Sequence, residues 1–217
     1  MVSNKPKQLC GGIWVYQDSV IHETATLCPG ACVGLPPSPD DDCEEYRSLR
    51  TIVGANCYLG AYSVLFRGAI LDENVFIDCY SRVGSNTSIG VGSRILYGAR
   101  IHNDVSIGKQ CVIGGNCSNG VKIGNYVTHM GRIAHTYNSP HSEWAETEEP
   151  SPVIEDYAVI GANALIIGPV IIGRNSYVAA GEIVRKSIPP KCIVYCGKIY
   201  THDEWKGGLK KHGYFDK

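Results

Sequence analysis

Aliphatic side chains recur at every sixth position along most of this chain. The series runs unbroken from Val53 to Ile113, is already present at Val15, and is found again from Ile154 to Val184. A period of six does not fit an α-helix, where such positions fall on different faces, or a strand, which alternates every two residues. It fits a coil of three short strands. Each six-residue unit then supplies one strand and one corner, and successive coils stack about 4.8 Å apart.

Small or β-branched residues form a second series, four positions after each aliphatic residue. Its members are Cys57, Ser63, Ala69, Val75, Ser81, Thr87, Ser93, Ala99, Val105, Cys111 and Cys117. Gly, Asn and Asp are frequent between the two series, and these residues tolerate tight corners. The sequence therefore predicts a narrow solenoid, with aliphatic residues filling its interior and small residues beside its corners.

Three segments interrupt the six-residue period, and irregular segments are where a regular scaffold usually carries its function. Residues 35–50 form a polar, proline-containing loop with an acidic centre, and residues 137–152 form a second polar loop. A smaller irregularity is predicted at 119–122, because Ile113 and Ile123 are ten residues apart. His129 and His135 occupy predicted repeat positions directly before the second loop, which makes that loop the most suggestive stretch.

Composition narrows the possible partners and the compartment. The chain has 20 Lys and Arg against 21 Asp and Glu, without a basic run, so we expect no nucleic-acid partner. It has no apolar run long enough to span a membrane, and its N-terminus lacks the apolar core of a signal peptide. We therefore expect a cytoplasmic protein without a membrane partner. The ten cysteines show no paired metal-type spacing, which favours reduced thiols.

The C-terminal repeats resemble a known family. After the histidine-bearing loop the chain reads VIGANA, IIGRNS and AAGEIV, followed by Pro189-Pro190. This layout resembles the hexapeptide-repeat acyltransferases over roughly residues 13–190, and it is closest to the branch of maltose, galactoside and xenobiotic acetyltransferases. The resemblance implies an all-β, left-handed parallel β-helix that forms a homotrimer. We expect one domain over residues 1–217, with coils at about 13–190, extruded loops at 35–50 and 137–152, and a C-terminal cap at 200–217.

The resemblance also implies an activity, the acetyl-CoA-dependent O- or N-acetylation of a sugar, an amino sugar or another small polar acceptor. Acyl transfer needs a general base near the acceptor, which one neutral histidine can supply, and no metal is expected. His141, in the loop sequence SPH, and His135, at the end of the last coil before it, are both candidates for the base. No G-x-S-x-G nucleophile motif is present.

By the same resemblance, small residues of the C-terminal coils line the groove for acetyl-CoA, and two lysines contact its phosphates. The residues implied are Asn163, Ala164, Ser176, Ala179, Ala180, Gly181, Lys186 and Lys198. The chain departs from the family after the Pro-Pro pair, where it reads IVYCGKIY in place of V-x-G-x-P-A-K. This difference suggests either that the CoA end is bound differently or that the acyl donor is not CoA.

Two other readings stay open. Gamma-class carbonic anhydrases share the solenoid and bind a metal between subunits through three histidines. His102 follows a repeat position as one of their ligands does, but Ala69 replaces their acid, and His129 and His135 are six apart rather than five. The third reading is a non-catalytic trimeric scaffold, which the missing P-A-K motif permits.

Overall fold

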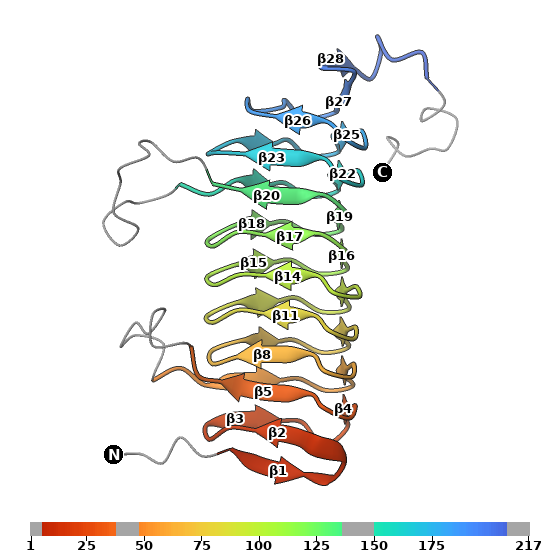
Figure 1. The fold of residues 1–217 in the computed structure, drawn as a ribbon. Helices are drawn as coiled ribbons and strands as arrows, with labels where there is room; N and C mark the ends of the chain where they lie inside the picture. Colours follow the sequence, from red (N-terminus) through yellow and green to blue (C-terminus); the bar gives the residue numbers. More distant parts are fainter. Residues whose placement is uncertain (1–5, 38–47, 136–149, 208–217) are drawn as a thin grey trace, which may run out of the picture.

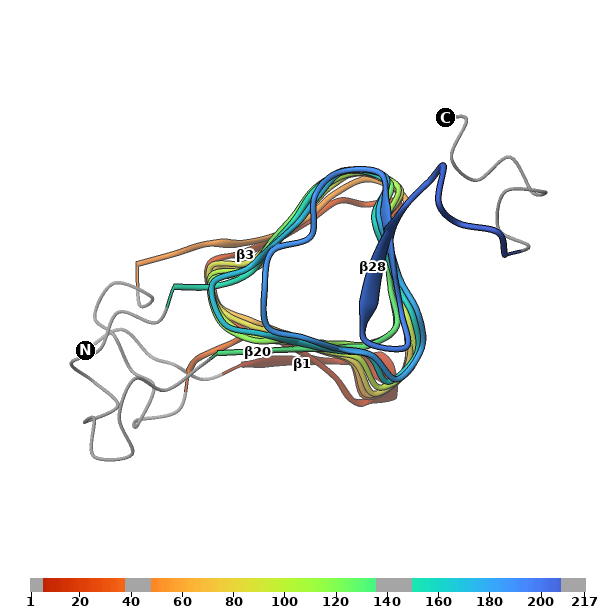
Figure 2. The ribbon, with the colours of Figure 1, turned by 90° about the horizontal axis from the view of Figure 1, so that it is seen from above.

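Three sheets form the walls of a triangular tube, and each coil of the chain contributes one short strand to each wall (Figures 1 and 2). The computed structural model describes residues 6–37, 48–135 and 150–207. Strand pairing is parallel throughout the coils, while antiparallel pairs occur at the two ends, between β1 and β2 and between β27 and β28. The only helical element in the described segments is the 3₁₀ turn η1 (Cys10–Gly12).

The three walls are named sheets A, B and C in the order in which the chain visits them. Sheet A comprises β1 (Lys7–Leu9), β2 (Ile13–Val15), β5 (Cys32–Leu35), β8 (Val64–Phe66), β11 (Arg82–Val83), β14 (Arg100–Ile101), β17 (Asn116–Cys117), β20 (Arg132–Ala134), β23 (Leu165–Ile167) and β26 (Ile183–Val184). Sheet B comprises β3 (Ser19–Ile21), β6 (Thr51–Val53), β9 (Ile70–Leu71), β12 (Ser88–Ile89), β15 (Ser106–Ile107), β18 (Lys122–Ile123), β21 (Val153–Ile154) and β24 (Ile171–Ile172). Sheet C comprises β4 (Thr26–Leu27), β7 (Tyr58–Leu59), β10 (Phe76–Ile77), β13 (Arg94–Ile95), β16 (Val112–Ile113), β19 (Thr128–His129), β22 (Val159–Ile160), β25 (Tyr177–Val178), β27 (Cys192–Tyr195) and β28 (Lys198–Thr201).

The solenoid is left-handed. Viewed from the C-terminal end, the chain passes clockwise from sheet A to sheet B to sheet C while it rises toward the viewer (Figure 2). The corners between the walls are named AB, BC and CA in the same order. The left-handed parallel β-helix expected from the resemblance is therefore confirmed.

The interior is built as the six-residue period predicts. Every aliphatic repeat position from Val53 to Ile113 points inward, with 0–4% of its surface exposed. The two-residue strands alternate, so the residue before each inward position faces out, and Arg94 next to Ile95 is an example. Of the second series, all members are buried beside the corners except Cys117, which takes a strand position and pairs with Ile101.

The irregularity predicted at 119–122 lies elsewhere, and this prediction was wrong. Between β16 and β17 the CA corner has two residues, Gly114 and Gly115, where the coil below has the four residues 96–99. The next coil repeats this shortening with Met130 and Gly131 between β19 and β20. Glycine is needed there, because a Cβ on Gly115 would overlap the carbonyl oxygen of Gly131. In Figure 2 the green coils accordingly cut inside the others at this corner.

The two long interruptions share one corner, and sheet C ends in a hairpin. Residues 36–50 lie between β5 and β6, and residues 135–152 lie between β20 and β21, so both fall at the AB corner. At the C-terminal end β27 and β28 form an antiparallel hairpin, and the Trp205 ring packs against Tyr195 and Tyr200, with centroids 5.4 and 5.5 Å away. Glu182 holds the hairpin turn, because its carboxylate accepts hydrogen bonds from the N–H groups of Cys196 and Gly197.

Candidate functional site

His135 lies at the AB corner, at the end of the coil that precedes the second interruption. It directly follows β20 and is half-buried, and it is the last residue described before the segment 136–149. Because of the two shortened CA corners, the inward repeat position of this coil is Ile133, which is 4% exposed. The prediction that His135 occupies a repeat position was therefore wrong. It lies one residue past the strand, at the AB corner, and both of its ring nitrogens are buried there.

His129 occupies an inward position on sheet C and is fully buried. It pairs with Ile113 below and Ile160 above, and its Nε2 lies 3.3 Å from the backbone oxygen of Asn116. Its Nδ1 has no hydrogen-bond partner, and burial lowers the pKa of the imidazole to about 4. His129 is thus a neutral core residue with no exposed surface, out of reach of any substrate or of a metal held between subunits.

The other candidates are distributed as follows. His141 and the rest of the segment 136–149 lie outside the described residues. His102 is exposed at the AB corner, two coils below His135. Among the described residues, no group of three or more His, Cys, Asp or Glu side chains is placed to hold a metal ion. Burial raises the pKa of the Cys117 thiol to about 12, so this thiol is a poor nucleophile.

The predicted acetyl-CoA residues other than Ser176 fall into three places. Asn163 and Ala164 lie at the CA corner of one coil, and Ala179, Ala180 and Gly181 lie at the same corner of the next, where the Gly181 N–H donates to the Ala162 oxygen over 2.9 Å. Of these, Asn163, Ala180 and Gly181 are exposed. Exposed Lys198 is on β28, whose hairpin Glu182 ties to this corner, whereas exposed Lys186 lies at the AB corner. The CA corner of the last coils thus gathers most of the set.

Ser176 is placed differently from the other predicted acetyl-CoA residues. Its side chain is completely buried at the BC corner. The hydroxyl donates to the oxygen of Pro189 over 2.8 Å and accepts from the N–H of Cys192 over 3.1 Å. Both contacts tie the last coil to the one below, so the hydroxyl is already fully used inside the protein.

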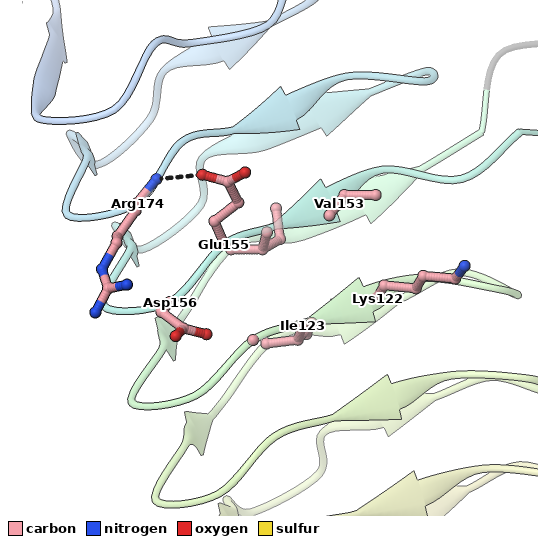
Figure 3. A pocket seen from close by; sticks show the side chains of 8 residues that line it. Lys122, Ile123, Val153, Glu155, Asp156 and Arg174 are labelled. Carbon is pink, nitrogen blue, oxygen red and sulfur yellow. Dashed lines mark hydrogen bonds between the residues drawn. The ribbon is translucent and has the colours of Figure 1, made fainter.

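An open depression of about 510 Å³ lies on the outer side of sheet B, above β18 and beside β21 (Figure 3). Its carboxylates are engaged: the Glu155 carboxylate accepts from the N–H of Arg174 at 2.7 Å, and that of Asp156 accepts from the N–H of Asn125 at 2.7 Å. The Arg174 guanidinium lies 5.2 Å from the centroid of the Tyr157 ring. Lys122 also lines the depression, which sits next to the point where the described chain re-enters sheet B.

Comparisons with known proteins agree with the repeat. Residues 151–181 match the family described as bacterial transferase hexapeptide, and residues 50–78 and 104–128 match the hexapeptide repeat of succinyl-transferase. The bifunctional protein GlmU of Desulfitobacterium hafniense is 25% identical over 206 residues, which cover 94% of this chain and 39% of that protein. GlmU of Thermosipho melanesiensis is 29% identical over 166 residues, which cover 74% of this chain and 31% of that protein. The chain therefore spans about two fifths of the length of the first relative.

A solved structure has the same fold. The UDP-N-acetylglucosamine acyltransferase of Francisella novicida aligns with a TM-score of 0.57 at 19% identity, covering 92% of this chain and 73% of that one. Fold and repeat thus define a left-handed parallel β-helix protein. The chain is similar to the hexapeptide-repeat transferases over the three matched segments, and the comparisons do not single out one branch of them. No helix among the described residues is long and apolar enough to cross a membrane.

Proposed function

We propose that the protein is an acyltransferase that moves an acetyl group from acetyl-CoA to a hydroxyl or amine of a sugar or another small polar acceptor. The observation that supports this most is the position of His135. It is a half-buried histidine at the AB corner, directly before an interruption, in a chain whose repeats match the bacterial transferase family. His129, the other histidine of this region, is sealed in the core.

The chemistry needs little from the protein. A neutral imidazole takes the proton from the acceptor as its oxygen or nitrogen attacks the thioester carbonyl carbon. Backbone N–H groups can stabilise the resulting oxyanion. When the tetrahedral intermediate collapses, the C–S bond breaks, the acetyl group stays on the acceptor, and the imidazolium returns its proton to the CoA thiolate. His135 and His141 both remain candidates for this base.

For the acyl donor, we propose the CA corner of the last coils as the binding groove. Exposed Asn163, Ala180 and Gly181 leave the backbone accessible to a pantetheine arm, and a Cβ on Gly181 would meet no atom within 4 Å. Lys198 lies on the hairpin that Glu182 ties to this corner, and Lys186 lies at a different corner. Ser176 would act only indirectly, by holding the last coil in place.

We also propose a homotrimer with its sites between subunits, as the resemblance to the hexapeptide-repeat acyltransferases implies. Among the described residues the depression beside β21 is open to solvent and is formed by one wall of the tube (Figure 3). A second subunit packed along the solenoid would provide the opposite wall and exclude water. Sedimentation equilibrium would give three times the mass of one 23.5 kDa chain.

The direct test is a turnover measurement with acetyl-CoA and a panel of amino sugars, sugars and small amines, following CoA release by chromatography. Replacing the true base with alanine should lower turnover by roughly 10²- to 10⁴-fold and leave the KM for acetyl-CoA unchanged. We would compare His135→Ala, His141→Ala and the control His102→Ala, which removes an exposed histidine at the same corner. Wild-type turnover in both of the first two variants would refute the assignment of the base.

A further inference from the structure

The outer face of sheet A changes character along the solenoid. Its outward residues, one per coil from the N-terminal end, are Trp14, Cys32, Val64, Arg82, Arg100, Asn116, Arg132, Leu165 and Ile183. Apolar residues thus flank a central zone of four coils that carries three arginines and one asparagine. The row contains no carboxylate within the described strands.

Arg82 and Arg94 have a structural contact on the solenoid surface, and Arg100 and Arg132 of the central zone differ in this respect. The guanidinium of Arg82 lies 4.4 Å from the centroid of Phe66, and that of Arg94 lies 4.7 Å from the centroid of Phe76, each ring belonging to the coil below. Such stacking supports the coil stack. The side chains of Arg100, Asn116 and Arg132 make no hydrogen bond, ion pair or ring contact with any described residue.

These three side chains lie in direct register. Arg100 pairs with Asn116, and Asn116 pairs with Arg132, so they stand on adjacent strands about 4.8 Å apart. Arg100 and Arg132 are exposed, and Asn116 between them is half-buried. The guanidinium groups of Arg100 and Arg132 can therefore both reach a ligand that lies over the side-chain amide of Asn116. Guanidinium N–H groups match the oxygen spacing of phosphate and bind it through paired hydrogen bonds.

The residues at the two edges of this row connect it to the proposed acetyl transfer. His135 follows Arg132 by three residues, at the AB edge of the same strand. At the CA edge, Tyr97 is 68% exposed, and the next two coils are set back by their two-residue corners. The Tyr97 ring meets the Tyr80 ring edge to face, with centroids 5.7 Å apart, and the CA corners of the next two coils carry no aromatic residue above it. An anion held over Asn116 would thus lie between an exposed aromatic ring and the candidate base.

We propose that Arg100, Asn116 and Arg132 form a phosphate-binding site on the outer face of sheet A, and that the phosphate belongs to the acceptor. This inference rests on the proposed acetyl transfer and narrows its substrate class to phosphorylated acceptors. Acetyl-CoA also carries phosphates, but its proposed groove lies at the CA corner of the last coils, beyond apolar Leu165. The two phosphate sources are separated by the experiment below.

The test measures binding of inorganic phosphate and pyrophosphate by calorimetry to the wild type and to Arg100→Gln and Arg132→Gln. Each replacement removes one charge and should weaken pyrophosphate binding about tenfold or more, because hydrogen bonds to charged groups are strong. The matched control is Arg94→Gln, which removes the same charge from sheet C and should change the affinity by less than about twofold, as expected for distant screened charges. Arg132→Lys keeps the charge without the paired hydrogen bonds and should be intermediate.

Three results would overturn the proposal. The first is that neither anion binds the wild type, and the second is that Arg94→Gln weakens binding as much as the two test variants, which would indicate a general charge effect. The third is that Arg100→Gln and Arg132→Gln weaken acetyl-CoA binding equally, which would assign the phosphate to the donor. Anion binding needs no acetyl transfer, so a protein that binds pyrophosphate in the expected pattern but acetylates no acceptor would keep this site and lose the proposed function.

Discussion

The buried histidine of the core gives a sharp test of the fold, because its protonation state is coupled to stability. His129 is completely buried, and burial lowers its pKa from 6.5 to about 4. Between these two pH values the folded chain holds the imidazole neutral while the unfolded chain protonates it. Folding then releases a proton, and the stability that this group contributes is complete above about pH 6.5 and is lost as the pH falls toward 4.

The size of this effect follows from the two pKa values. At 1.36 kcal/mol per pKa unit, a fall from 6.5 to about 4 corresponds to about 3 kcal/mol for each chain. Replacing His129 with leucine removes the titrating group and fills a position whose neighbours in register are Ile113 and Ile160. We therefore expect His129→Leu to gain about 3 kcal/mol relative to the wild type as the pH falls from 6.5 to about 4.

The assay is urea unfolding followed by tryptophan fluorescence, at one protein concentration and at a series of pH values across this range. Carboxylates titrate in the same range, so the informative quantity is the difference between variant and wild type rather than either curve. His22→Leu, at an exposed histidine, serves as the control and should run parallel to the wild type. If His129→Leu also runs parallel, then His129 is not a neutral core residue and the register at the shortened corners is wrong.

Three further outcomes are expected. Gly115→Ala should destabilise the fold by about 1–3 kcal/mol in chemical unfolding, because its Cβ would collide with the backbone of the next coil. Ser176→Ala should cost about 1–3 kcal/mol, since it leaves the buried N–H of Cys192 without an acceptor; a changed KM for acetyl-CoA without lost stability would contradict this structural role. Arg174→Gln should cost about 0.5–1 kcal/mol by removing the cation from the Tyr157 ring, a loss that thermal unfolding should detect.

The strands and the residues of the core could be predicted from the sequence, because only one arrangement buries every aliphatic repeat position. An interior three strands wide accepts an aliphatic side chain at each inward position, so the six-residue period gave the strands and the core together. The error at 113–123 arose because two registers satisfy the same spacing. Cys117 is small enough to read as a corner residue, yet it fills a strand position, and Asn119 stays at its corner, where its side chain accepts the N–H of Asn103.

Which outward residues lie side by side depends on the register of the coils, and for this reason the arginine row could not be predicted from the sequence. A regular coil of eighteen residues pairs Arg82 with Arg100, and by the same count it would set Arg100 beside Ser118. The shortened CA corners reduce the next two steps to sixteen residues and bring Asn116 and then Arg132 into line with Arg100. They also put Ile133 inward, which leaves His135 at the AB end of its strand. Each of the two shortened corners lacks two residues, and it can do so because Gly115 and Gly131 carry no Cβ. These corners therefore place Arg100 and Arg132 on the same sheet of the solenoid, with the candidate base His135 at its AB edge.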